Sequence, residues 1–259
     1  MENQLIVSKF FSGLSGLQVN VPRHEYPLEY QGASRLTYYA SFFNSIEINS
    51  SFYKLPMQVT VKKWASSVPD DFRFTFKLWK NITHNKNLEF SIDDILKFMN
   101  VVNEVYDKKG CILIQFPPGL HSGNLTALDH LLGCIKKFQP VSPWPLAVEF
   151  RNRSWYTDEV YETLQNHNVT IVIQDLPASS TPMFNITSDV VYVRFHGPTG
   201  NYRESYPDHF LSEYALYIHE WMNENKNVFV YFNNTMGDAF NNMETLNKLV
   251  IEHSLNYSR

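Results

Sequence analysis

The sequence contains only two cysteines, Cys111 and Cys134, and no Cys-X-X-Cys spacing. This scarcity argues against a disulfide framework and against a zinc ribbon. Cys111 opens an apolar segment, so we expect both cysteines to be small, unpaired core residues.

Long apolar runs are also missing. No stretch of about 18 apolar residues is present, and the chain does not start with a basic and then apolar segment, so we expect no membrane partner and a cytoplasmic location. Low-complexity tracts, linkers and internal repeats are absent as well. A composition of 44% hydrophobic and 19% charged residues then predicts one globular domain over residues 1–259.

An excess of positive charge is lacking too. The net charge of −4 argues against a general affinity for nucleic-acid backbone, although it leaves room for a local basic patch. A dinucleotide-binding, glycine-rich fingerprint after the first expected strand is absent, which disfavours an open doubly wound sheet.

Four segments of the sequence alternate apolar side chains with polar or charged ones. In LAVEFR (146–151), for example, Leu146, Val148 and Phe150 form an apolar row, and Glu149 and Arg151 belong to the other row. Because side chains alternate faces along a strand, each segment predicts a strand with one ionisable face. Charges on that face mark a site, since burying them costs free energy unless they find partners.

Short apolar runs alternate with segments of helical period, which is typical of a parallel sheet built from βα units. We expect eight strands: residues 9–13, 45–49, 72–78, 111–116, 146–151, 169–175, 190–196 and 227–233. Eight such units in 259 residues agree with a single-domain TIM-type (β/α)8 barrel.

Four helices are predicted from apolar residues that recur every three or four positions. Ser91 is expected to cap the first, and the four apolar sets are Ile92, Ile95, Leu96, Met99 and Val102; Leu125, Leu128, Leu132, Ile135 and Phe138; Leu211, Tyr214, Ile218 and Trp221; and Phe240, Met243, Leu246 and Val250. The short segment 176–189 contains two prolines, so we expect the helix between the sixth and seventh strands to be reduced or missing.

In such a barrel the site lies at the carboxyl ends of the strands. The polar residues expected there are Glu47, Lys77, Gln115, Glu149, Arg151, Asp175, Arg194, His196 and Asn233.

Several long motifs at these positions resemble one known family, the domain of unknown function 72 family, also called YecE-like. The motifs are YYASFFNSIEINSSFYKLP (38–56), DFRFTFKLWKNITH (71–84), IQFPP (114–118), LAVEFRNRSW (146–155), VYVRFHG (191–197) and VYFNN (230–234). The resemblance runs through nearly the whole chain and implies a TIM-type barrel, but it implies no reaction. One departure is the first strand end, which reads GLSGL (13–17) where the family usually has a GTSGW-like motif, so a stacking role for this loop is in doubt.

The candidate catalytic residues are Glu149, Asp175, Lys77, Glu47 and His196. Two carboxylates in different environments can divide acid and base roles. Lys77 could act as a Schiff-base nucleophile, a general acid or an anion contact. Purely structural alternatives stay open: a buried ion pair between Glu149 and Arg151, and a salt bridge between Lys77 and Glu47.

The candidate substrate-binding residues are Arg194, Arg151, Gln115, Asn233, His84 and Tyr231. Arginine suits bidentate recognition of carboxylate or phosphate, so an anion at Arg194 is the sharpest expectation, and a structural arginine is its alternative. His84 has a hydrogen-bonding scaffold role as its alternative, and Tyr231 has core packing. We expect no metal and no cofactor, because Lys77, Arg151 and Arg194 in the same mouth would repel a cation.

The leading functional hypothesis is a metal-independent enzyme, a hydrolase or a lyase, that acts on a small phosphorylated or carboxylated anion, with sugar-like compounds among the candidates. A second hypothesis is a nucleic-acid barrel that grips phosphates with Lys54, Lys77, Lys80 and Lys86 and with the aromatic residues Phe52, Tyr53 and Trp79. A third is a ligand-binding or partner-binding barrel without catalysis. The sequence leaves the substrate, the reaction and the oligomeric state open.

Overall fold

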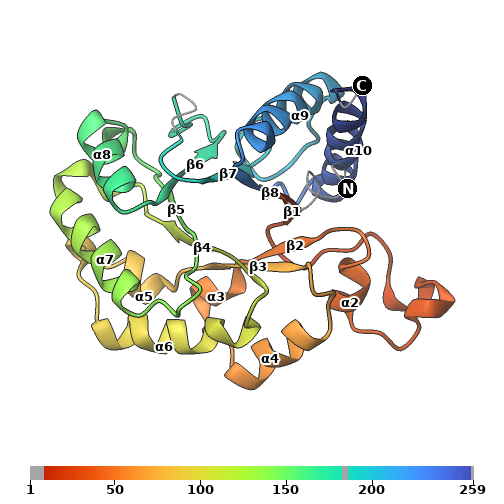
Figure 1. The fold of residues 1–259 in the computed structure, drawn as a ribbon, viewed down its shortest axis with the longest axis horizontal. Helices are drawn as coiled ribbons and strands as arrows, with labels where there is room; N and C mark the ends of the chain where they lie inside the picture. The colour runs from red at the N-terminus through yellow and green to blue at the C-terminus, as the bar shows by residue number, and fades with distance from the viewer. Residues whose placement is uncertain (1–8, 183–185, 258–259) are drawn as a thin grey trace.

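Eight parallel strands form a nearly closed barrel in the computed structural model, and helices cover its outside (Figure 1). The structure describes residues 9–182 and 186–257. The strands are β1 Phe10–Leu14, β2 Ser45–Ile48, β3 Arg73–Lys77, β4 Lys109–Gln115, β5 Leu146–Glu149, β6 Thr170–Gln174, β7 Val190–Phe195 and β8 Asn227–Phe232. Their order around the sheet is β1-β8-β7-β6-β5-β4-β3-β2. The expected (β/α)8 fold is confirmed, and each observed strand end lies within two residues of the predicted one.

The helices are α2 Arg35–Tyr39, α3 Ser50–Tyr53, α4 Gln58–Ser66, α5 Lys80–Thr83, α6 Ile92–Val102, α7 Leu125–Lys137, α8 Asp158–Asn166, α9 Asp208–Asn223 and α10 Ala239–Tyr257. Short 3-10 turns are η1 Arg23–Glu25, η2 Leu28–Tyr30, η3 Lys86–Leu88, η4 Asn103–Val105, η5 Ser122–Asn124 and η6 Arg153–Trp155. The four predicted helices are α6, α7, α9 and α10. Between β6 and β7 the described residues contain no helix, as the short segment predicted.

Helix α6 differs from the expectation in two details. Ser91 is its N-cap residue, but the Ser91 side chain makes no capping hydrogen bond. Ile92 and Leu96 are 51% and 39% exposed, whereas Ile95 and Met99 are buried. The buried face is rotated from the predicted one: it also includes Phe98 and Val101, and it leaves Ile92 and Leu96 together on one edge.

Two sets of apolar side chains follow the period-two alternation of the strands. One set points outward and packs under the helices; it includes the predicted row Phe72, Phe74 and Phe76. The other set fills the barrel interior: Phe11, Cys111, Leu113, Ala147, Val172, Val190, Tyr192, Phe229 and Tyr231. Both cysteines are buried and unpaired, as predicted.

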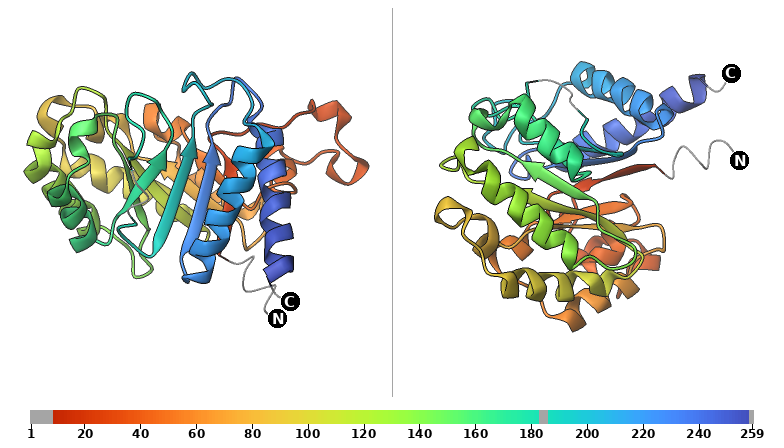
Figure 2. Two further views of the ribbon diagram at one scale, coloured as in Figure 1. Left: turned by 90° about the horizontal axis from the view of Figure 1, so that it is seen from above. Right: turned by 60° about the vertical axis from the view of Figure 1, so that its left-hand side comes forward.

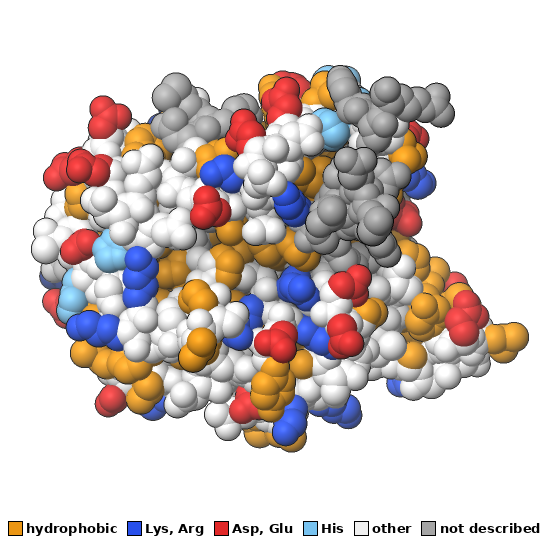
Figure 3. Space-filling view, viewed as in Figure 1, with side chains coloured by type: hydrophobic (Ala, Val, Ile, Leu, Met, Phe, Trp, Pro, Cys, Tyr) orange, Lys and Arg blue, Asp and Glu red, His pale blue; other side chains and the backbone are white. Residues whose placement is uncertain are grey.

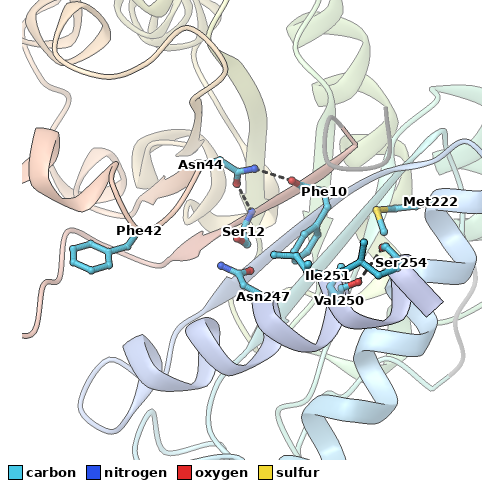
Figure 4. A pocket seen from close by; sticks show the side chains of 10 residues that line it. Phe10, Ser12, Phe42, Asn44, Met222, Asn247, Val250, Ile251 and Ser254 are labelled. Carbon is cyan, nitrogen blue, oxygen red and sulfur yellow. Dashed lines mark hydrogen bonds between the residues drawn. The ribbon is translucent and has the colours of Figure 1, made fainter. Parts of the chain in front are cut away.

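Side chains rather than a backbone ladder close the ring between β1 and β2, at a place we call the β1–β2 seam. The Ser12 amide donates to Asn44 Oδ1 at 2.8 Å, and the Asn44 amide donates back to the Phe10 carbonyl at 2.8 Å (Figure 4). The Leu14 amide donates to the Tyr39 hydroxyl at 2.8 Å. These side chains satisfy backbone groups that would otherwise be unpaired at a sheet edge.

The two strands approach closely at the seam. The Tyr39 hydroxyl donates to the Ser45 carbonyl at 2.9 Å. A Cβ atom at Gly13 would lie 2.0 Å from that carbonyl oxygen, so only glycine fits. One direct bridge joins Ser15 to Glu47 beyond the seam, at the carboxyl ends of the strands.

The connection from β1 to α2 projects from the barrel. Figure 1 and the left view of Figure 2 show this segment, with η1 and η2, extending away from the other helices. Next to it, on the outside of the barrel, an apolar cavity of about 240 Å³ lies between β1 and α10 (Figure 4). Phe10, Val250 and Ile251 are among the residues that line it.

Candidate functional site

The carboxyl ends of the strands surround a buried network of charged side chains. Glu47 lies near the carboxyl end of β2, Glu149 near that of β5 and Arg194 near that of β7, each on the interior face. The exposed fractions of Glu47, Glu149 and Arg194 are 0%, 0% and 1%. Strand parity therefore brings three of the predicted residues together out of water, where charges interact strongly.

Arg194 lies at the centre of this network. Its Nε and Nη2 atoms donate to Glu47 Oε1 at 3.1 and 2.8 Å, and its Nη1 atom donates to Glu149 Oε2 at 3.0 Å. The remaining donors contact His196 Nε2 at 3.0 Å and Asn49 Oδ1 at 3.4 Å. Protein acceptors thus occupy every N–H of the guanidinium group, which has five in all.

Arg151 is the second guanidinium group of the network and is more open. Its Nε atom donates to Glu149 Oε1, its Nη1 atom to the Tyr202 hydroxyl at 3.2 Å, and its Nη2 atom to His196 Nε2 at 3.1 Å. Among the residues that the structure describes, one N–H on Nη1 and one on Nη2 have no acceptor. Arg151, and not Arg194, therefore keeps donors for a ligand.

His196 is held as a neutral imidazole. Arginine is a donor only, so the His196 Nε2 atom accepts from both guanidinium groups and the ring proton lies on Nδ1. That Nδ1 atom donates to Asp175 Oδ1 at 3.2 Å, and the His196 amide donates to the same oxygen at 2.8 Å. Burial lowers the pKa of His196, partly opposed by its bond to Asp175. The other Asp175 oxygen accepts from the Tyr206 hydroxyl.

The two buried glutamates remain ionised. Burial alone would raise the pKa of Glu47, but the Arg194 charge and its hydrogen bonds outweigh that effect and lower it. Burial likewise opposes ionisation of Glu149, and the charges of Arg151 and Arg194 hold its pKa well below the ordinary value. Carboxylates in this state are poor proton acceptors at neutral pH.

We expect acid to destabilise the protein strongly. Glutamates with a lowered folded pKa contribute stability that is present above the unfolded value of about 4.3 and is lost as the pH falls through the folded pKa. Neutral His196 acts in the same direction below about pH 6.5, because the unfolded chain takes up a proton there. Urea midpoints measured from pH 7 to pH 3 should fall, and less steeply in Glu149→Gln. A midpoint that stays constant from pH 5 to pH 3 would contradict this account.

A cavity of about 510 Å³ opens above the network. Its basic and amide lining consists of Lys77, Arg151, Arg194, Asn49, Gln115 and Asn233. Phe52, Tyr53, His84, Pro118 and Tyr202 complete the described lining. No aspartate or glutamate belongs to this described lining, because the carboxylates lie beneath it.

Lys77 ends β3 and lines the cavity, and no carboxylate of the described residues is paired with it. Its Nζ atom lies 4.3 Å from the centre of the Phe52 ring, a cation–π contact. No ion pair joins Lys77 to a carboxylate of the described chain, because Arg194 occupies the position expected for it beside Glu47. Burial, and next the Arg194 charge, lower the pKa of Lys77 to about 8.

The other predicted binding residues divide into two groups. Gln115 and Asn233 line the cavity, and so does His84, whose pKa is lowered to about 4 by burial and by the Lys77 charge. Tyr231 does not reach the cavity: it is fully buried, and its hydroxyl bonds to Ser45 Oγ at 2.6 Å and Thr75 Oγ1 at 2.7 Å. Its position corresponds to the core-packing alternative.

Three lining residues, Asn49, Pro118 and Tyr202, were absent from the expected site residues. Asn49 follows Glu47 by two positions, so strand parity could have placed it at the mouth. Tyr202 lies in the loop after β7 at a φ of 65°, and no sequence pattern points to it. Its hydroxyl orients Arg151, and its ring packs against His196 with 5.7 Å between ring centres.

The residues of the nucleic-acid hypothesis are dispersed. Lys77, Phe52 and Tyr53 line the cavity, whereas Lys54, Lys80 and Lys86 are exposed outside its lining. On the face seen in Figure 3, acidic and basic side chains are interspersed with hydrophobic ones. No broad single-sign surface for a phosphate backbone is visible on the described part of that face.

Within the part of the chain that the structure describes, no group of three or more His, Cys, Asp or Glu side chains is placed to hold a metal ion. No helix within residues 9–182 and 186–257 is long and apolar enough to cross a membrane.

The sequence profile of a family described as "Protein of unknown function DUF72" matches residues 11–257. The chain belongs to this family. Among DUF72 relatives, UPF0759 protein YunF of Bacillus subtilis (strain 168) is 28% identical over 261 residues, which cover 88% of this chain and 91% of that protein. UPF0759 protein YecE of Escherichia coli (strain K12) is 30% identical over 120 residues, 46% of this chain and 44% of that protein.

Solved DUF72 structures share the fold. A DUF72 family protein from Enterococcus faecalis V583 superposes with a TM-score of 0.78 at 23% identity, covering 93% of this chain and 95% of that chain. A DUF72 family protein from Thermotoga maritima MSB8 gives a TM-score of 0.68 at 25% identity, with 93% and 98% covered. The expected family and barrel are confirmed, and the reaction has to be inferred from the site.

Proposed function

We propose that the mouth cavity binds a small anionic compound, phosphorylated or carboxylated, and that the protein is an enzyme that acts on it without a metal. The supporting observation is the charge of the described lining, which includes Lys77 and Arg151 and no carboxylate. A cation would be repelled there, whereas an anion would be attracted.

The buried network explains why this charge is available. Glu47 and Glu149 are neutralised by Arg194 and Arg151 beneath the cavity, at N–O distances of 2.8 Å from Glu47 and 3.0 Å from Glu149 to Arg194. Lys77 remains without a counter-ion among the described residues. In this proposal Arg194 positions the two carboxylates, and the spare N–H groups of Arg151 contact the anion.

Proton transfer falls to Lys77 in this arrangement. A group whose pKa of about 8 lies close to neutral pH can both accept and donate a proton. Glu149 is held ionised by two arginines, and Asp175 is engaged by His196 and Tyr206, so both act as positioning residues. Asn233 and Gln115 are placed to bind uncharged parts of the substrate.

A thermal-shift screen tests the proposal. The melting temperatures of the wild type, Lys77→Met and Lys54→Met would be measured with and without inorganic phosphate, glycerol 3-phosphate, lactate and short oligonucleotides. An anion at 100 times its Kd should stabilise the wild type by about 2.7 kcal/mol. We expect that stabilisation to persist in Lys54→Met, because Lys54 is exposed outside the cavity, and to be lost in Lys77→Met.

The outcomes separate the functional classes. Stabilisation by oligonucleotides alone, weakening steeply with salt, would replace the proposal by nucleic-acid binding. If an anion binds saturably but NMR detects no product from it over several hours, the protein is a binding protein and not an enzyme. No shift with any anion would overturn the proposal.

A further inference from the structure

Lys77 is an amine for which the described residues provide no hydrogen-bond acceptor. Its Nζ atom faces the cavity and the Phe52 ring at 4.3 Å, and the described chain offers it no carboxylate. A lysine that is fully out of water is almost always paired, whereas half-buried Lys77 has only the Phe52 ring as a described partner. In its neutral form, such an amine has a lone pair available for bond formation.

The two carboxylates that could form an ion pair with protonated Lys77 are already engaged. Glu47 accepts from the Ser15 hydroxyl at 2.5 Å, the Tyr192 hydroxyl at 2.5 Å, and Arg194. Glu149 accepts from both arginines. The guanidinium groups thus both remove the acceptors of Lys77 and add positive charge near it, and positive charge favours a neutral amine.

Extending the proposed function, on which this step rests, we propose that Lys77 is a nucleophile that condenses with a carbonyl group. The substrate class would then be small aldehydes or ketones that carry a carboxylate or a phosphate. The spare N–H groups of Arg151 hold the anionic group, and Lys77 attacks the carbonyl carbon in the same cavity.

The chemistry balances without a further reactant. The Lys77 nitrogen adds to the carbonyl carbon, and a proton moves from nitrogen to oxygen to give a carbinolamine. That hydroxyl takes a proton from solvent and leaves as water, which forms the protonated imine. The imine withdraws electrons from adjacent C–H and C–C bonds, a use typical of lysine Schiff bases, and water addition releases the product.

Reductive trapping tests the inference. Wild-type protein at pH 7.5 would be mixed with glyoxylate, pyruvate or dihydroxyacetone phosphate and then with sodium cyanoborohydride, whose hydride reduces the imine carbon to a stable amine. Intact mass and peptide mapping locate the adduct. With a pKa of about 8, about a quarter of Lys77 is neutral at pH 7.5, against about one part in a thousand for a lysine of ordinary pKa. We therefore expect Lys77 to react at least tenfold faster than the exposed Lys54 and Lys80.

The pH profile adds a second readout. The rate at Lys77 should rise up to about pH 8 and then level off. The charged or titratable groups that face Lys77 are Arg194, Glu149, Glu47, Arg151 and His84. Lys77→Arg keeps a positive charge but should lose the adduct, and Lys80→Arg should retain it.

The controls distinguish this inference from the proposed function. Lactate and glycerol 3-phosphate carry the same charges without a carbonyl group. If they stabilise the protein but the carbonyl compounds label Lys77 no faster than Lys80, the anion site stands and the imine is wrong. If neither kind of compound binds or labels Lys77, both proposals fail.

Discussion

Replacing Arg194 with methionine should lower the free energy of unfolding by about 3–5 kcal/mol, the typical cost of removing one partner from a buried ion pair. The side chain is 1% exposed and contacts both Glu47 and Glu149. Without Arg194, Glu149 keeps Arg151, but Glu47 becomes a buried carboxylate that no other cation of the described residues contacts. Urea denaturation of the wild type and the variant measures the loss.

A double variant separates charge from packing in this prediction. In Arg194→Met with Glu47→Gln the unpaired carboxylate is removed, so the urea midpoint should be higher than in the single variant. If Arg194→Met alone stays within about 1 kcal/mol of the wild type, the buried network does not have the energetic role that its geometry indicates.

Trp155→Ala should cost about 3–5 kcal/mol, because a fully buried indole leaves a large cavity. The Trp155 ring stacks on Phe150 with 4.7 Å between ring centres and on Phe116 with 6.0 Å. Its Nε1 atom donates to the Leu120 carbonyl at 2.8 Å. The indole therefore joins the loop after β4 to the loop after β5, which includes Arg151.

This substitution should also weaken anion binding, although Trp155 lies outside the cavity lining. Urea denaturation measures the stability, and thermal shift with the ligand found for the wild type measures the binding. Trp155→Phe is the matched control: it retains an aromatic ring, loses the N–H bond to Leu120 and part of the stacked ring area, and should cost less than Trp155→Ala. Equal losses in the two variants would show that the hydrogen bond, and not the stacking, joins the loops.

Strand positions were predictable because a half-buried strand leaves a period-two pattern. That pattern placed Glu47, Glu149 and Arg194 on interior faces, where the structure has them. The long helices α6, α7, α9 and α10 were predictable because their apolar residues recur every three or four positions. The helices α3 and α5 were not, since four residues are too few to show a helical period.

Partners of the charged residues were not predictable from the sequence. We expected an anion at Arg194 and weighed a salt bridge between Lys77 and Glu47, whereas Arg194 itself holds Glu47. A residue's position in the sequence indicates on which face of its strand the side chain lies, but not how far that side chain is from those on other strands. The same limit applies to Tyr39 and Asn44, whose roles at the β1–β2 seam depend on side chains that reach across from outside β2.

The β1–β2 seam has a mechanical consequence. Other neighbouring strands are joined by repeated backbone hydrogen bonds, whereas β1 and β2 are joined here by the side chains of Tyr39 and Asn44. The carboxylate of Glu47 lies next to them, toward the carboxyl ends of the strands. That carboxylate, Glu47, is also the first link of the charge network through Arg194. Glu47 thus contacts both β1, through Ser15, and the charge network, through Arg194, so we expect a displacement of β1 from β2 to move the floor of the cavity as well.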